Sequence, residues 1–118
     1  MKVLAVFSDL FVQSRITELV ARTNGQVEFA TNAEHVKKLL ATYQPDLTVL
    51  DLSSSEYDAF SIAQEIRAKS YGKLFGIFPH VRKDLKTRAD LAGFDFVVPN
   101  SGFLTILGRT LSRELKQG

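Results

Sequence analysis

Two aspartates stand at the ends of short apolar runs, where a carboxylate is well placed for chemistry. Asp9 comes two residues after the run Val3–Phe7, and Asp51 directly follows the run Leu47–Leu50. Such runs between helical segments are typical of buried parallel strands, and ligands of open α/β sheets bind at the carboxyl ends of those strands. Two acids at one sheet edge predict a shared site. The alternative for each acid is that it caps the helix that follows.

The composition describes a globular chain with a core of its own. Its 118 residues are 45% hydrophobic and 24% charged, which predicts one domain over 1–118, with no output domain. The absence of Cys excludes disulfides and thiolate metal sites. The apolar run near the N-terminus is too short for a membrane span or a secretory signal, so we expect a cytoplasmic protein without membrane contact.

Charge is spread unevenly along the chain. Residues 1–59 hold five Lys or Arg and eight Asp or Glu, whereas 60–118 hold ten and five. Solvated helix faces explain most such patterns, and an acidic partner is the functional alternative. Aromatic residues do not alternate with these charges, which disfavours nucleic acid as a ligand. The basic residues that mark a candidate partner surface are Arg82, Lys83, Lys86, Arg88, Arg109 and Arg113.

Strand and helix patterns alternate about every twenty residues. We expect strands at 2–7, 26–30, 47–52, 73–78 and 94–98, with helices at 11–23, from 32 to about 44, from 59 to about 70, at 83–92 and from about 101. Five such units predict an α/β, doubly wound parallel sheet with five helices. The flavodoxin-like strand order 2-1-3-4-5 would place Asp9 and Asp51 side by side.

Three short motifs resemble the receiver domain of two-component response regulators. They are Ser8-Asp9, the phrase from Pro45 to Asp51, and Ala92-Gly93-Phe94-Asp95, and the similarity covers essentially the whole chain. The resemblance implies that a histidine kinase transfers a phosphoryl group to Asp51. It also implies that Asp9, Asp51 and the Ser53 carbonyl hold the Mg²⁺ that this transfer needs.

Four positions depart from the pattern of that family. Ser8 stands in place of the first acid, and Phe78 in place of the Ser or Thr that contacts the phosphoryl group. Asn100 stands in place of the Lys after the fifth strand, and Val97 in place of the switch aromatic. A phenyl ring donates no hydrogen bond, and an amide cannot pair with phosphoryl charge as an ammonium does. We therefore predict a degenerate receiver, or pseudo-receiver.

The resulting hypothesis is a non-enzymatic signalling module that acts through protein–protein interaction. It requires no cofactor and binds Mg²⁺ weakly at most. Its partner is a histidine kinase or another signalling protein, and the face of the fourth helix, fifth strand and fifth helix is the expected surface for that partner or for a homodimer. The first alternative is a working phosphorelay receiver with Asp51 as acceptor. A nucleotide- or cofactor-binding domain is least favoured, because no glycine-rich loop follows the first strand.

Overall fold

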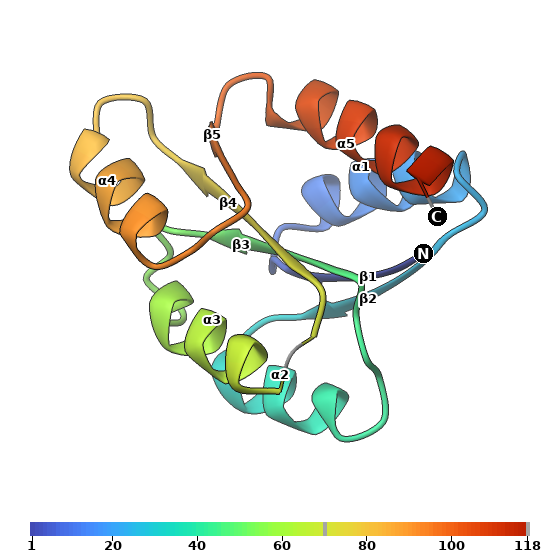
Figure 1. Ribbon diagram of the computed structural model, residues 1–118, viewed down its shortest axis with the longest axis horizontal. Helices are drawn as coiled ribbons and strands as arrows, with labels where there is room; N and C mark the ends of the chain where they lie inside the picture. Colours follow the sequence, from blue (N-terminus) through green and yellow to red (C-terminus); the bar gives the residue numbers. More distant parts are fainter. Residues whose placement is uncertain (70, 118) are drawn as a thin grey trace.

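The core of the molecule is a five-stranded parallel sheet (Figure 1). The computed structural model describes the backbone of residues 1–69 and 71–117, and side chains within those ranges as far as Arg113. The strand order is β2-β1-β3-β4-β5, which confirms the predicted topology. The strands are β1 (Lys2–Val6), β2 (Gln26–Ala30), β3 (Leu47–Asp51), β4 (Lys73–Phe78) and β5 (Phe96–Pro99).

Helices cover both faces of this sheet. One face carries α1 and α5, and the opposite face carries α2, α3 and α4 (Figure 1). None of the helices in the described ranges has the length and apolar character needed to span a membrane. Their bounds are α1 (Leu10–Ala21), α2 (Ala33–Leu40), α3 (Ala59–Ala68), α4 (Lys83–Leu91) and α5 (Phe103–Gln117).

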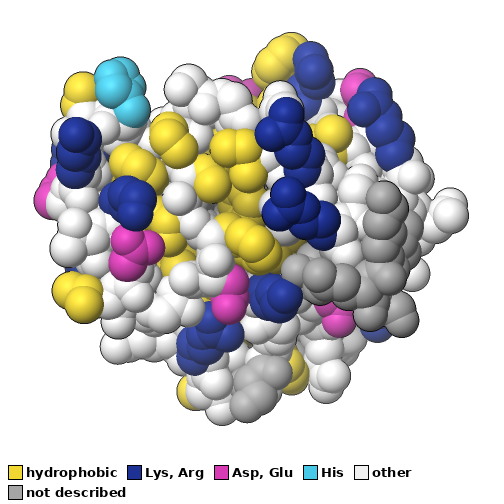
Figure 2. Space-filling view, turned by 45° about the horizontal axis from the view of Figure 1, so that its top comes forward, with side chains coloured by type: hydrophobic (Ala, Val, Ile, Leu, Met, Phe, Trp, Pro, Cys, Tyr) yellow, Lys and Arg dark blue, Asp and Glu magenta, His cyan; other side chains and the backbone are white. Residues whose placement is uncertain are grey.

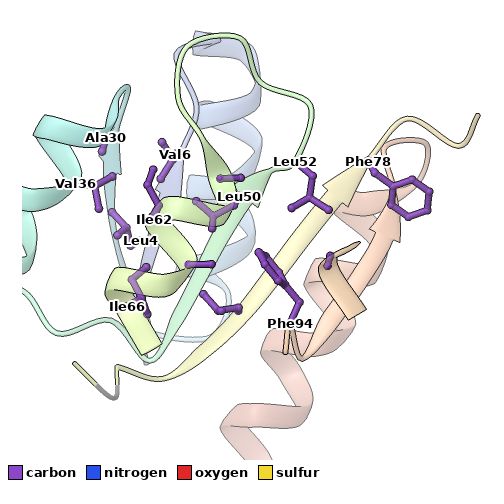
Figure 3. Close-up of a cluster of buried hydrophobic side chains, with 14 of the residues drawn as sticks. Leu4, Val6, Ala30, Val36, Leu50, Leu52, Ile62, Ile66, Phe78 and Phe94 are labelled. Atoms are coloured by element: carbon purple, nitrogen blue, oxygen red, sulfur yellow. The ribbon is translucent and has the colours of Figure 1, made fainter. Parts of the chain in front are cut away.

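The central strands are apolar on both sides because each face of the sheet has its own core. In β1, Leu4 and Val6 pack toward α2 and α3, whereas Val3 and Ala5 pack toward α1 and α5. This alternation follows from the two-residue period of a strand. Figure 3 shows the first of these cores, with side chains from the sheet meeting Ile62 and Ile66 of α3.

Several predicted boundaries were wrong. The second helix ends at Leu40 rather than near residue 44. The fifth strand begins at Phe96 rather than at residue 94, because Gly93 turns the chain at φ +86° and the Phe94 amide still donates to the Ala89 carbonyl of α4. The Phe94 ring instead lies over Gly76, where an added Cβ would come within 3.0 Å of it. The first helix ends at Ala21 rather than at residue 23, and Asn24 at φ 56° reverses the chain.

Asp46 and Asp95, two acids of the receiver-like motifs, form hydrogen bonds to strands at the edge of the sheet where the strands begin. The Lys2 amide donates to Asp46 Oδ2 at 2.7 Å, which ties β1 to the residue before β3. Asp95 Oδ2 accepts from the Leu74 amide at 2.8 Å and from the Arg67 guanidinium at 2.7 Å. These acids lie at the edge opposite Asp51, so they hold strands in register there.

Candidate functional site

The candidate site lies at the carboxyl ends of β1 and β3, which are neighbours in the sheet. Val6 pairs with Leu50 in the parallel ladder, so the chain emerges from both strands at one edge. Asp51 is the last residue of β3, and Asp9 precedes α1. The topology therefore brings the two predicted acids to one edge of the sheet.

Asp9 is the N-cap of α1, as the capping alternative predicted. Its backbone is extended, and its Oδ1 accepts hydrogen bonds from the amides of Phe11 at 2.8 Å and Val12 at 3.2 Å. These are two of the first-turn N–H groups that lack a partner within a helix. Asp9 is exposed. Its structural task therefore occupies one carboxylate oxygen.

Asp51 does not cap a helix, so the capping prediction is wrong for this residue. The polar loop that follows β3 delays the start of α3, and Asp58 is the N-cap of that helix. Asp51 is partly buried, and its Oδ1 accepts from the Ser53 amide at 3.0 Å and the Ser53 hydroxyl at 2.9 Å. This local turn fixes the direction of the carboxylate.

Tyr57 bridges the two strand ends. Its hydroxyl accepts from the Asp51 amide at 2.7 Å and donates to the Val6 carbonyl at 2.9 Å. Burial raises the pKa of the Tyr57 phenol, and the nearby Asp51 and Glu56 carboxylates raise it further. The sequence reasoning missed this residue. An aromatic side chain within the polar segment 53–58 was the available signal.

Glu56 is the second residue that the sequence reasoning missed. The Ser8 hydroxyl donates to Glu56 Oε1 at 2.6 Å, across a separation of 48 residues. The loop after β3 therefore brings a carboxylate to the position where the resemblance leads one to expect an acid after β1. Glu56 is itself held by a hydrogen bond from its amide to the Ser54 hydroxyl at 3.1 Å.

Two of the positions that depart from the receiver pattern, Phe78 and Asn100, are neighbours in the structure. The backbone amide of Asn100 donates to the Phe78 carbonyl at 2.7 Å, which extends the pairing of β4 and β5 by one residue. Phe78 is only 4% exposed and belongs to the core beneath α4, at the end of its strand in Figure 3. Val97 packs against the same core from β5. The Phe78 ring therefore lies in the core, and this hydrogen bond of Asn100 is made by its backbone.

The donor types at this edge suit a hydrated divalent cation, but the set of acids is small. Within the described ranges, Asp9 Oδ2 and Asp51 Oδ2 accept no hydrogen bond from the protein. Carboxylate oxygens are the ligands that Mg²⁺ prefers. No group of three or more His, Asp or Glu side chains in the described part of the chain is arranged to hold a metal. Any Mg²⁺ would therefore retain most of its water.

The basic residues around α4 are partly neutralised by acids of the same segment. Arg82 pairs with Asp84 at 2.9 Å, and Lys86 pairs with Asp90 at 2.8 Å. The hydrogen bond from Arg82 lowers the pKa of the Asp84 carboxyl. The Arg88 guanidinium stacks over the Phe60 ring at 3.9 Å, so its charge faces the loop after β3.

Comparison with known proteins rests on structure, since no family model and no curated protein matches the sequence. A response regulator from Thermotoga maritima matches with a TM-score of 0.82 at 18% identity, covering 98% of this chain and 97% of its own. The signal receiver domain of a DNA-binding response regulator from Colwellia psychrerythraea 34H matches with a TM-score of 0.85 at 21% identity, covering 98% of both chains.

The fold is that of response-regulator receiver domains. A further receiver domain, from Bermanella marisrubri, matches with a TM-score of 0.74 at 24% identity and covers 84% of each chain. The fold places the predicted acids, the β3–α3 loop, Ser8, Phe78 and Asn100 at one edge of the sheet, whereas Val97 lies within β5 opposite Gly76. Its strand order is the one that the sequence pattern predicted.

Proposed function

We propose that this chain is a receiver-like signalling module that acts by binding another protein, with an incomplete phosphorylation site. One observation carries the proposal. The chain retains the acid at the end of β3 but lacks two of the side chains that would contact a phosphoryl group. Asp51 remains at the end of β3, whereas Phe78 and Asn100 occupy the positions that the resemblance assigns to a hydroxyl and an ammonium. We propose no enzymatic activity for the module.

The electrostatics of phosphoryl transfer support this proposal. Negative charge builds on the equatorial oxygens of the transferred group, and catalysis depends on cations and hydrogen-bond donors held ready for it. In the described structure Asp51 has no ion pair with Lys or Arg. Its nearest donors are the amide and hydroxyl of Ser53, which are neutral and already bonded to it.

The proposed partner surface is formed by α4, β5 and α5. Figure 2 brings this side of the molecule forward and shows hydrophobic side chains at its centre with Lys and Arg on both flanks. β5 is an edge strand with four partly buried residues, and Leu91 at the end of α4 is 85% exposed. An apolar centre with a basic rim suits a protein with an acidic rim, and a second copy of this chain is the competing occupant.

The experiment that tests the incomplete site is chemical phosphorylation. The protein is incubated with Mg²⁺ and acetyl phosphate, and its intact mass is measured over time. We expect no stoichiometric phosphoryl adduct, because the charge on the transferred group lacks a cationic partner at Asp51. A stoichiometric adduct that disappears in Asp51→Asn would refute the proposal.

A matched gain-of-function variant makes this test more specific. Ser8→Asp together with Asn100→Lys restores the acid and the ammonium at two exposed positions. Ser8→Asp also removes the donor to Glu56 and places two carboxylates side by side, a repulsion that bound Mg²⁺ would offset. We expect this variant to form an adduct faster than the wild type. An adduct in neither protein, while a known receiver treated in parallel is labelled, would show that residues other than these two limit the reaction.

A phosphorelay receiver is the second candidate, and one observation favours it. Asp51 keeps a free Oδ2 at the carboxyl end of β3, beside a crevice that also holds Asp9 and Glu56. A carboxylate in that position is a competent nucleophile if a partner kinase supplies the missing cation. The same mass measurement, repeated with a phosphorylated histidine donor, separates this candidate from the first.

A further inference from the structure

A second candidate surface lies on the opposite side of the sheet from α4, in a groove between α1 and α5. These two helices lie side by side on one face (Figure 1). The groove between them has a volume of about 620 Å³. α1 starts at the Asp51 edge with its cap Asp9, but the groove begins only at Arg15. It therefore lies away from the crevice. Its lining shares α5, with Arg109 and Arg113, with the α4–β5–α5 face, but includes no described residue of α4 or β5.

The groove is strongly basic. Four arginines line it, two from each helix, and Glu18 is the only carboxylate among its described lining residues. None of the four forms an ion pair within the described part of the chain. The arginines are Arg15, Arg22, Arg109 and Arg113. Unpaired guanidinium groups in a concave surface are well suited to bind carboxylate or phosphate oxygens in pairs.

The arginines follow the repeat of a helix. Arg15 lies on α1, and Arg22, the C-cap residue of that helix, lies two turns further along. Arg109 and Arg113 are one turn apart on α5. At 1.5 Å per residue, the α1 pair spans about 10 Å along the groove. Charges spaced in this way match acids placed at helical intervals on a partner.

The apolar floor of the groove consists of Leu19 and Leu104, which line it together with the polar Thr23, Thr105 and Ser112. Both leucines are partly buried. At Gly108 a Cβ would lie 3.3 Å from Leu19 Cδ2, so the missing side chain lets the two helices approach closely. An apolar floor between basic walls fits a ligand that is amphipathic as well as acidic.

We propose that the α1–α5 groove binds an acidic, amphipathic helical segment of a partner protein. This inference rests on the proposed function as a protein-binding module and assigns it a second surface. Acidic side chains of the segment pair with the arginines, and its apolar side chains lie on Leu19 and Leu104. Nucleic acid fits less well, because no aromatic side chain on which bases could stack lines the groove in the described residues.

Titration with a defined peptide tests the proposal. The probe is a synthetic helix of about five turns with Glu on one face and Leu on the adjoining face, added to isotope-labelled protein while amide NMR shifts are recorded. A polyglutamate of equal charge tests the role of the apolar floor. A single-stranded oligonucleotide of equal charge tests the competing ligand class.

Two variants with the same change in charge provide the control. Arg22→Glu with Arg109→Glu reverses two charges in the groove, and Lys83→Glu with Lys86→Glu reverses two on α4. All four positions are exposed, and unfolding in urea checks that each variant folds. We expect the groove variant to weaken peptide binding by at least about tenfold and the α4 variant to leave it nearly unchanged.

The expected result is a set of amide shifts confined to α1 and α5, with the peptide bound more tightly than either polyglutamate or the oligonucleotide. Amide shifts on α4 and β5 instead would refute the groove as the binding site, although the module would still bind a protein segment. Equal loss in both variants, tighter binding of the oligonucleotide, or no shift at millimolar peptide would also overturn it. Phosphorylation of Asp51 would count against the proposed function and leave this result unaffected.

Discussion

At the scale of single residues, the phenol of Tyr57 connects the ends of β1 and β3. Its hydroxyl accepts from the Asp51 amide and donates to the Val6 carbonyl, 51 residues away in the sequence. Both are backbone groups at the ends of their strands. A hydroxyl that satisfies two such groups holds the crevice in one conformation.

Replacing Tyr57 by Phe removes this bridge without changing the ring. We expect Tyr57→Phe to lower the free energy of unfolding by about 1–3 kcal/mol, because two backbone groups lose their partner. Urea denaturation followed by circular dichroism measures the change. An unchanged unfolding midpoint would mean that water replaces the hydroxyl at no cost.

The same variant tests the titration of this phenol. Burial keeps the pKa of Tyr57 above its ordinary value of 10.0 in the folded protein, so the unfolded chain loses its proton first. Stability due to Tyr57 is therefore complete below about pH 10 and declines as the pH rises further. We expect the wild type to lose stability above that pH more steeply than Tyr57→Phe does. Parallel curves would contradict the assignment.

The sequence located the acids of the crevice but not their partners. Asp9 and Asp51 were predictable because each follows an apolar run that ends a strand, and topology brings strand ends together. Tyr57 and Glu56 were not, because their partners Val6 and Ser8 lie about fifty residues away. Nothing in a polar loop indicates which strand end it will fold back to meet.

At the scale of the elements, Gly76 allows β4 to pack closely against the turn before β5. Gly76 lies in the middle of β4, opposite Leu50 and Val97 in the ladder. A Cβ there would come within 3.0 Å of the Phe94 ring and 3.1 Å of Leu52 Cδ1. The bare backbone therefore provides the space that Phe94 fills. This contact also explains why Phe94 looked like a strand residue in the sequence, since it is apolar and buried.

We expect Gly76→Ala to destabilise the protein by about 1–3 kcal/mol, because the core around Phe94 has no spare room. Gly108→Ala is the matched control. Its Cβ would meet only the end of the partly buried Leu19 side chain at 3.3 Å, and alanine is favoured within a helix by up to about 1 kcal/mol. Thermal unfolding should therefore shift in opposite directions for the two variants. A shift in the same direction would show that Leu19 cannot move aside.

The basic surfaces show a different limit of sequence reasoning. Arg109 and Arg113 stood out because the C-terminal half of the chain has excess positive charge. Arg15 and Arg22 lie in the half with excess acid and were overlooked. The fold places all four around one groove. Net charge counted along the sequence does not distinguish residues that lie on different faces of a helix.

At the scale of the whole molecule, the sheet divides the interior into two cores. Ile62 of α3 lies in one core and Ile16 of α1 lies in the other. The two clusters share no residue, although every central strand contributes to both. Their side chains are therefore coupled only through the backbone of the sheet.

We expect Ile16→Val and Ile62→Val each to cost about 0.5–1.5 kcal/mol, since each removes one buried methylene group. The double variant should lose the sum of the two within about 0.5 kcal/mol, because the sites share no partner. Urea denaturation of the four proteins in this cycle provides the measurement. A larger deviation would show that strain in one core is transmitted through the strands to the other.

The bridge made by Tyr57 has an optical consequence. The chain contains three tyrosines and no tryptophan, so its near-ultraviolet absorption arises mainly from phenols. Anything that entered between the tips of β1 and β3 would have to break the bridge and expose this ring to water. The absorption band of that tyrosine would then shift to shorter wavelength. The protein thus carries a label-free spectroscopic indicator of whether its crevice opens, without the need to attach a dye.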